Sequence, residues 1–308
     1  MKKVTQAVIV SLAVVLFVFI GEAAHAAVVT DEVGRRVRIS GTPQRIVSLA
    51  PGMTEILFAL NLDGQVVGVT SFCDWPREAG QKTSVGGFTN PSLEKIVSLK
   101  PDLILATADG NRPETVRQLE KIGMTVYVIN PVDTVGILQS IRNIGEVTGQ
   151  RQAARSLNAQ LQGRLDAITA QISNKKRPRV FFQIGMDPVI TVGRRTMISD
   201  VIERAGGTNI AGKDTARYPR YSAEGVMAHA PDILLFAPMA TDREFKKVKR
   251  YWEQFPGIPA VKNKQIYPIN TDLIGRASPR IVDAIEQVAK ILHPEIIIKA
   301  TRQKQKET

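Results

Sequence analysis

The side chains that most often carry out catalysis are scarce in this chain. It has 308 residues, with one cysteine, Cys73, and three histidines, of which His229 and His293 lie in the second half. No Gly-x-Ser-x-Gly turn and no glycine-rich phosphate loop are present. A hydrolase using Ser71 or Cys73 is the enzymatic alternative, but no base accompanies either residue. The two histidines fall on different expected elements, without cysteine or carboxylate at ligand spacing. We therefore expect no catalytic residue, no metal site and no cofactor.

Aromatic, polar and turn-forming residues instead collect in six loops next to expected strands and helices. These loops are residues 70–76, 86–90, 107–111, 185–188, 218–221 and 271–276. Ligands of open α/β sheets bind beyond the carboxyl ends of the strands, so these loops could form two facing walls. Apolar surface with a few polar groups suits a large flat ligand, although any single aromatic could instead be a core residue. The residues expected to bind this ligand are Phe72, Trp75, Phe88, Gly110, Asn111, Met186, Tyr218, Asp272, Leu273, Ile274, Gly275 and Arg276.

The elements that must position these loops occur twice along the chain. Residues 92–105 read as a short helix, a Pro-Asp break and a buried strand, and residues 222–235 repeat this order. Helix and strand patterns alternate on both sides of each copy, including expected strands over residues 66–69 and 126–129 and expected helices over residues 113–121 and 134–147. This alternation favours a mainly parallel sheet. We predict an α/β fold of two Rossmann-like lobes with central sheets, residues 27–145 and 178–298, with the ligand cleft between them.

A long helix is expected between the lobes, in a linker of residues 146–177. From Leu157 to Ile172, leucine and isoleucine recur every three or four residues, which marks one apolar stripe on a helix. Such a helix over residues 150–173 would be roughly 36 Å long at 1.5 Å per residue. It would make the protein stiff, with little closure on its ligand; the alternative is a helix packed wholly on one lobe.

Both ends of the chain carry recognisable segments. Lys2 and Lys3, an apolar run over residues 8–20 and the sequence Ala24-His25-Ala26 predict a cleavable signal peptide, residues 1–26. A retained membrane anchor is the alternative. Residues 299–308 form a basic tail, and the formal net charge is +12. Without a nucleic-acid-binding motif, this charge indicates a solvated basic surface rather than a nucleic-acid partner. We expect a monomer in a bacterial periplasm.

Glu94 and Glu224 occupy equivalent places in the two copies, each two residues after a serine that could cap a helix. A carboxylate in the first turn of a helix is favoured by the helix dipole, by about 0.3–1 kcal/mol, and this alone explains both residues. Equally, one exposed carboxylate on each lobe could mark a docking point for a partner.

Several segments resemble the helical-backbone substrate-binding proteins of bacterial ABC importers, and within that family the members that bind cobalamin. The resemblance covers nearly all of the chain after the signal peptide. The segments that carry it include Arg45-Ile46-Val47-Ser48-Leu49-Ala50-Pro51, Asp74-Trp75-Pro76, Lys100-Pro101-Asp102-Leu103 and Arg276-Ala277-Ser278-Pro279-Arg280. It implies capture of a corrinoid and its delivery to a membrane permease. It further implies that Phe72, Phe88, Tyr218 and residues 272–276 contact the ligand, and that Glu94 and Glu224 pair with permease arginines.

The candidate contact residues depart from the cobalamin-binding pattern. Phe72, Phe88 and Tyr218 replace a tyrosine and two tryptophans, and Leu273 and Ile274 replace aromatic residues. The pocket keeps its apolar character but loses hydrogen-bonding groups. A ferric-siderophore or haem receptor of the same fold is therefore the alternative function, since haem receptors of this family often bind iron through a tyrosine, and Tyr218 and Tyr221 lie in the candidate loops.

Overall fold

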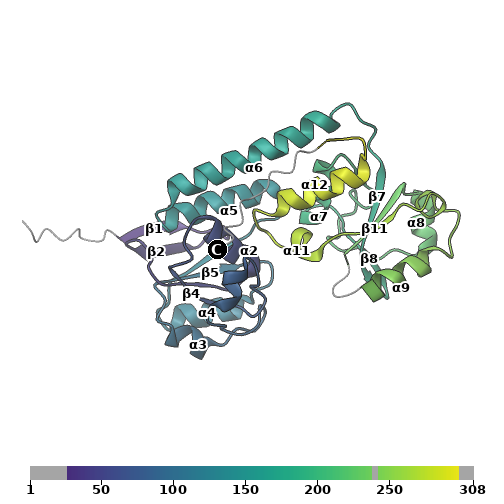
Figure 1. Cartoon of the computed structure of the whole chain (residues 1–308). Coiled ribbons are helices and arrows are strands. Elements are labelled where there is room, and N and C mark those ends of the chain that lie inside the picture. Colours follow the sequence, from purple (N-terminus) through teal and green to yellow (C-terminus); the bar gives the residue numbers. More distant parts are fainter. Residues whose placement is uncertain (1–25, 238–241, 298–308) are drawn as a thin grey trace, which may run out of the picture.

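The computed structural model describes residues 26–237 and 242–297. The expected basic tail and the expected signal peptide, except its last residue, lie outside this part of the chain. The described residues form two α/β lobes that lie side by side, with one long helix extending along both (Figure 1).

The first lobe is built on a four-stranded parallel sheet in the order β4-β3-β5-β6. Its strands are short and almost wholly buried, as expected for a parallel sheet covered on both faces. Its strands and helices are β3 (Ile46–Ser48), α2 (Pro51–Ala59), β4 (Val66–Val69), η1 (Arg77–Gln81), α3 (Leu93–Ser98), β5 (Leu103–Thr107), α4 (Pro113–Lys121), β6 (Val126–Ile129) and α5 (Thr134–Val147), preceded by the antiparallel pair β1 (Ala26–Thr30) and β2 (Arg36–Ser40).

The second lobe contains a five-stranded sheet in the order β11-β10-β7-β8, with β9 paired to β7. Its elements are β7 (Arg179–Met186), β8 (Val189–Thr191), α7 (Met197–Arg204), β9 (Thr208–Asn209), α8 (Ala223–His229), β10 (Ile233–Phe236), α9 (Asp242–Trp252), α10 (Pro259–Lys262), β11 (Ile266–Pro268), α11 (Thr271–Ile274) and α12 (Ile281–Leu292).

One part of this sheet differs from the expected pattern. Residues 185–188 were expected to form a loop, but β7 continues to Met186 and turns back into the antiparallel strand β8. Gly185 pairs with Ile190 and Met186 with Val189, so backbone pairing with β8 keeps both residues in the strand. The second sheet is therefore mixed.

The two repeated segments have the same fold, and this fold explains why they share certain residues. Ser92 caps α3 by accepting a hydrogen bond from the Lys95 N–H, and Ser222 caps α8 in the same way. After each helix, an aspartate carboxylate accepts a backbone hydrogen bond at the start of a central strand, from the residue before β3 in the first lobe and from the first residue of β7 in the second. Asp102 accepts from the Arg45 N–H at 3.0 Å, and Asp232 accepts from the Arg179 N–H at 2.8 Å. The Pro-Asp break thus ties two strands together in each lobe.

The long helix α6 (Arg151–Ile172) packs against α5 of the first lobe and α12 of the second. Its apolar stripe is buried at Leu161, Leu165, Ile168 and Ile172. In the middle of the helix, the Arg164 guanidinium forms ion pairs with Asp283 at 2.5 Å and Glu286 at 2.9 Å, both on α12. Burial alone would lower the pKa of Arg164, but the two carboxylates outweigh it and raise that pKa. The helix is therefore fastened to both lobes.

The largest hydrophobic cluster is continuous across the molecule. It includes Val37 and Ile141 from the first lobe, Leu165 from α6, and Val180 and Leu292 from the second lobe. Each half of the molecule also has a smaller cluster on the other face of its sheet. Within residues 26–237 and 242–297, no helix has the length and apolar content needed to cross a bilayer.

Candidate ligand-binding cleft

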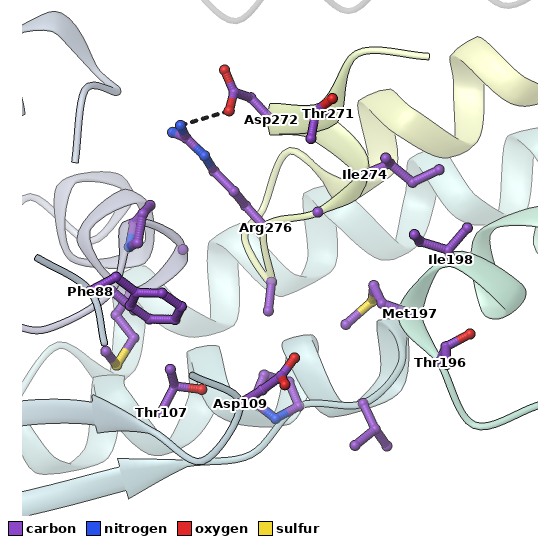
Figure 2. Close-up of a pocket in the computed structure, with 18 of the residues that line it drawn as sticks. Phe88, Thr107, Asp109, Thr196, Met197, Ile198, Thr271, Asp272, Ile274 and Arg276 are labelled. Atoms are coloured by element: carbon purple, nitrogen blue, oxygen red, sulfur yellow. Dashed lines mark hydrogen bonds and ion pairs between the residues drawn. The ribbon is translucent and has the colours of Figure 1, made fainter. Parts of the chain in front are cut away.

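A cavity of about 360 Å³ lies between the two lobes (Figure 2). The first lobe contributes Ala50, Pro51, Gly52, Met53, Phe72, Phe88, Thr107, Asp109, Ile129, Pro131 and Val132. The second contributes Thr196, Met197, Ile198, Arg217, Tyr218, Thr271, Asp272, Ile274, Gly275, Arg276 and Ala277. Most of this lining is apolar, and its charged groups are Asp109, Arg217, Asp272 and Arg276.

The first wall follows from the parallel sheet. Residues at or shortly after the end of each strand of this sheet line the cavity. They are Ala50 after β3, Phe72 after β4, Thr107 at the end of β5 and Ile129 at the end of β6. Because parallel strands have their carboxyl ends at the same edge, these four segments meet there. The topology of the first sheet thus determines where this wall of the cavity lies.

Phe88 is positioned in this wall by two residues that do not line the cavity. The Asn111 amide donates to the carbonyls of Phe88 at 2.8 Å and Leu49 at 3.0 Å, while its oxygen accepts from the Thr107 N–H at 2.8 Å. Asn111 is buried, so these bonds join three loops. Gly110 has a φ of 120°, and a Cβ there would lie 2.1 Å from the Phe88 ring. A side chain at position 110 would therefore displace the ring.

The second wall is formed by the start of α7, the Arg217–Tyr218 segment and the region of α11. Tyr218 is 49% exposed, and the Arg217 guanidinium lies 5.7 Å from the centre of its ring. Across the cleft, Phe72 is 58% exposed. Large apolar side chains with this much exposure, one on each wall, are surfaces that a bound ligand would cover.

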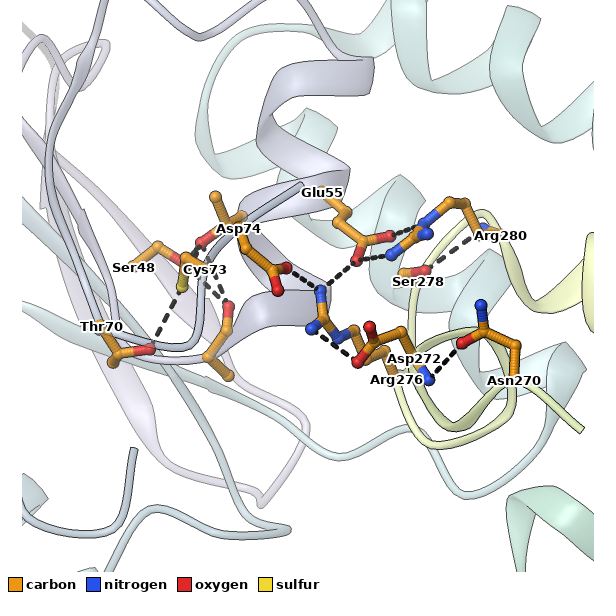
Figure 3. A network of polar contacts seen from close by, with 12 residues as sticks. Ser48, Glu55, Thr70, Cys73, Asp74, Asn270, Asp272, Arg276, Ser278 and Arg280 are labelled. Atoms are coloured by element: carbon orange, nitrogen blue, oxygen red, sulfur yellow. Dashed lines mark hydrogen bonds and ion pairs between the residues drawn. The ribbon is translucent and has the colours of Figure 1, made fainter. Parts of the chain in front are cut away.

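A network of charged side chains connects the lobes at the edge of the cavity (Figure 3). Arg276 of the second lobe pairs with Asp74 at 2.6 Å and Glu55 at 3.3 Å in the first, and with Asp272 at 2.8 Å. Arg280 donates two hydrogen bonds to Glu55, at 2.6 and 2.8 Å. Glu55 is buried, so both of its oxygens are satisfied by arginines from the opposite lobe. We call these five residues the inter-lobe ion cluster.

The ion cluster changes the acidity of two of its members. Burial works to lower the pKa of Arg276, but the hydrogen bond with Asp74 and the charges of Asp272, Asp74 and Glu55 outweigh it and raise that pKa. The hydrogen bond from Arg276 is the main cause that lowers the pKa of Asp74. Both groups therefore stay charged at neutral pH.

The expected ligand contacts divide into two sets. Those that line the cavity are Phe72, Phe88, Tyr218, Asp272, Ile274, Gly275 and Arg276. Those that do not line it are Trp75, Gly110, Asn111, Met186 and Leu273. The Trp75 ring lies under the Arg280 guanidinium, 4.6 Å away. Met186 packs against the second-lobe cluster at the β7–β8 hairpin, and Leu273 packs against the large central cluster.

Some lining residues were not among the expected contacts. Thr107, Asp109, Arg217, Thr271 and Ala277 lie in or directly beside the expected loops. Three further segments lie apart from those loops: residues 50–53, residues 129 and 131–132, and residues 196–198. The first two directly follow strands that the sequence predicts, so the strand-end rule could have found them. The third follows β8, which the sequence pattern did not indicate.

The residues considered for catalysis, Ser71 and Cys73, and for metal binding, His229 and His293, do not line the cavity. Cys73 is buried, and its Sγ lies 3.2 Å from the hydroxyl oxygens of Thr54 and Thr70 (Figure 3). His229 contacts the Gly225 carbonyl and His293 the Gly206 carbonyl, both in the second lobe. Within the described part of the chain, no cluster of three or more His, Cys, Asp or Glu could hold a metal ion.

Comparison with known proteins agrees with this geometry. A family model described as "Periplasmic binding protein" matches residues 46–273. The vitamin B12-binding protein of Salmonella typhimurium is 33% identical over 248 residues, covering 80% of this chain and 90% of that protein. The crystal structure of the periplasmic vitamin B12 binding protein BtuF of Vibrio cholerae has a TM-score of 0.72 and 29% identity, covering 81% of this chain and 96% of that one.

A haem-binding protein is structurally as similar. The apo form of the periplasmic heme-binding protein RhuT from Roseiflexus sp. RS-1 has a TM-score of 0.72 and 28% identity, covering 82% of this chain and 99% of that one. The two-lobed α/β fold, the cleft and the extent of these matches lead to one conclusion: the chain belongs to the periplasmic binding protein family.

Proposed function

We propose that this protein captures cobalamin or a related corrinoid in the periplasm and delivers it to an ABC importer. The observation that carries the proposal is the largely apolar cleft between two lobes, with Phe72 and Phe88 on one wall and Tyr218 on the other. A flat macrocycle between such walls buries aromatic surface on both faces, which favours binding by about 25 cal/mol per Å² before the costs of association. Relatives named vitamin B12-binding proteins support this ligand class.

The size of the cavity adds a constraint. Sites for small molecules usually measure roughly 300–1,000 Å³, and a corrinoid is larger than most of the ligands that fill them. A cavity of about 360 Å³ therefore holds only part of the ligand. The remainder must extend beyond the walls described above or require the lobes to move apart.

Calorimetric titration with cyanocobalamin and with haemin tests the ligand class. We expect cyanocobalamin to bind more tightly, and Tyr218→Ala to weaken that binding by about 10-fold or more, because truncating a central aromatic contact typically costs over 1 kcal/mol. Ile122→Ala serves as the control, since Ile122 is exposed but does not line the cavity. Tighter binding of haemin would replace the corrinoid proposal with the alternative.

The alternative ligand, haem, rests on Tyr218. This tyrosine lines the cavity, whereas the Tyr221 hydroxyl donates to Asp214 at 2.8 Å. Burial, followed by the hydrogen bond and charge of Asp214, raises the pKa of Tyr221 to about 12, which disfavours the phenolate that binds iron. If haem were the ligand, Tyr218→Phe would remove the tyrosinate–iron absorption band, and Tyr221→Phe would retain it.

We further propose that Glu94 and Glu224 dock the protein on its permease. Both glutamates are exposed in the first turn of equivalent helices, α3 and α8. One turn later each helix exposes an apolar side chain, Val97 or Met227, each 37% exposed. The N–H of Glu224 itself and the Ser222 hydroxyl lower the pKa of Glu224, which favours its charged form. An exposed carboxylate beside an apolar side chain on each lobe suits a two-point contact with basic residues.

A transport assay tests the docking proposal. The double variant Glu94→Arg with Glu224→Arg should bind ligand like the wild type but fail to support uptake, because charge reversal would repel the permease arginines. Glu114→Arg with Glu78→Arg is the matched control, with the same change of net charge at other sites. Normal uptake by the first double variant would contradict docking through these glutamates.

The remaining proposals follow from the same role. We propose that the chain is cleaved after Ala26, acts as a periplasmic monomer and catalyses no reaction. The intact mass of protein recovered from the periplasm tests the cleavage site, and sedimentation tests the oligomeric state. A ligand turnover that is lost in Cys73→Ala, with folding retained, would show an enzymatic function instead.

A further inference from the structure

A second cavity, of about 700 Å³, adjoins the cleft and has a different chemical character. It is lined by Val132, Asp133, Arg194, Arg195, Thr196, Ser199, Asp200, Glu203, Gly212 and Arg217. Val132, Thr196 and Arg217 line both cavities, so the two are contiguous. We call this second cavity the arginine pocket.

The carboxylates of the arginine pocket already have partners. Asp200 pairs with Arg204 at 2.9 Å and accepts a hydrogen bond from the Thr134 N–H at 2.9 Å. Glu203 pairs with Arg177 at 2.6 Å. Asp133 accepts a hydrogen bond from the Gly136 N–H at 2.7 Å and so caps α5.

The arginines that name the pocket are not paired in this way. Within residues 26–237 and 242–297, no carboxylate forms an ion pair with Arg194, Arg195 or Arg217. All three are exposed, and Arg217 lies over the Tyr218 ring at the junction of the two cavities. Three guanidinium groups around one cavity repel each other and favour an anion with several oxygen atoms.

We propose that the arginine pocket binds an oxyanion group on an arm of the ligand whose flat body occupies the main cavity. This inference rests on the proposed function, because it assumes a macrocycle between Phe72 and Tyr218. In cobalamin the oxyanion is the phosphodiester of the nucleotide arm, and in haem it is a carboxylate. Guanidinium groups bind both kinds of oxyanion through paired hydrogen bonds. The pocket also supplies space for the part of the ligand that the main cavity cannot hold.

Removing the anionic arm from the ligand and removing the arginines from the pocket should weaken binding in the same way. Cobinamide has the corrin ring of cobalamin but lacks its nucleotide arm and phosphodiester. We expect the triple variant Arg194→Gln, Arg195→Gln and Arg217→Gln to weaken cobalamin binding by about 10-fold or more and cobinamide binding by less than about 2-fold. The control is Arg36→Gln, Arg38→Gln and Arg155→Gln, which removes the same charge from exposed positions outside both cavities. It should bind both corrinoids like the wild type.

Three corrinoid results would overturn the inference. The first is an equal loss of affinity for both corrinoids in the pocket variant, because the arginines would then act without the phosphodiester. The second is the same loss in the control variant, because the effect would then be one of net charge alone. The third is unchanged cobalamin binding in the pocket variant.

A failure of the proposed function gives a different pattern. If the wild type binds haemin and no corrinoid, the corrinoid proposal fails, but the pocket inference can still be tested. In that case haemin should bind the wild type more tightly than its dimethyl ester does. This preference should be absent in the pocket variant, which lacks the arginines. If neither macrocycle binds, inorganic phosphate at fixed ionic strength still tests the pocket. We expect phosphate to raise the Tm of the wild type and of the control variant more than that of the pocket variant. Equal shifts would overturn the inference.

Discussion

Two groups of arginines border the cleft, and their surroundings differ. Arg276 and Arg280 are mostly buried and share Glu55, Asp74 and Asp272, so every positive charge has a carboxylate within ion-pair distance. Arg194, Arg195 and Arg217 are exposed, and none has an ion-pair partner among the described residues. The first group forms ion pairs between the lobes. The second group has no such intramolecular partner and is available to an anionic group of a ligand. Residue type alone does not separate these roles, since burial and pairing decide them.

The largest expected effect lies in the paired group. Glu55→Gln removes the carboxylate that Arg276 and Arg280 share, and we expect the free energy of unfolding to fall by about 3 kcal/mol. This is the lower end of the range for breaking a buried ion pair, because Arg276 keeps Asp74 and Asp272. Urea denaturation measures the change.

Glu114→Gln is the control for that experiment, since Glu114 forms an ion pair with Arg117 in which both side chains are more than half exposed. We expect it to cost about 0–1 kcal/mol. A similar small change for Glu55→Gln would mean that the paired group does not hold the lobes together, and the contrast between the two groups would fail.

A smaller effect should depend on pH. Arg276 lowers the pKa of Asp74 below its ordinary value of 3.8, so this pairing stabilises the folded protein above that pH. As the pH falls through the lowered pKa, Asp74 becomes protonated and the stabilisation is lost. Because the Asp74 side chain is 64% exposed, we expect the free energy of unfolding of the wild type to exceed that of Asp74→Asn by at most about 1 kcal/mol near pH 7.

Urea denaturation at several pH values would measure this difference, which should shrink below pH 3.8. In an Arg276→Gln background most of the pH dependence should be lost, since Arg276 is the main cause of the lowered pKa. An undiminished difference in that background would assign it to the other groups that lower this pKa, the Asp74 backbone N–H and Arg280.

The smallest effect is expected in the unpaired group. Arg194→Gln with Arg195→Gln should leave the free energy of unfolding within about 0.5 kcal/mol of the wild type, as for other exposed residues outside packed contacts. A slight increase is expected because repulsion between like charges is relieved. A clear loss of stability in thermal or urea unfolding would indicate that these arginines have a structural role, and the contrast would then be one of degree.

Much of the fold could be predicted because it depends on local patterns. The strands Val66–Val69 and Val126–Ile129 and the helices Pro113–Lys121 and Thr134–Val147 have the bounds expected from their sequence. The β7–β8 hairpin was missed because its Gly-Met-Asp-Pro turn region resembles a loop, and its pairing is decided by the neighbouring strand. Tertiary contacts override local pattern there.

The cleft was only partly predictable. Loops at strand ends and the family resemblance indicated Phe72, Phe88 and Tyr218, which line the cavity. Glu55 and Arg276 lie 221 residues apart, and nothing in the local sequence of either indicates the other. The role of Asn111 was equally hidden, because its hydrogen bonds position Phe88 rather than a ligand. Such contacts appear only when the chain is folded.

The hydrophobic cluster that extends from Val37 through α6 to Leu292 has a consequence for how the molecule comes apart. If either half melted alone, it would leave the other half's apolar surface in water, and the helix between them would lose part of its support. The two lobes are therefore expected to unfold together as one cooperative unit, although they are separate in shape. Heating should produce a single calorimetric transition, and neither half expressed by itself should be a stable protein.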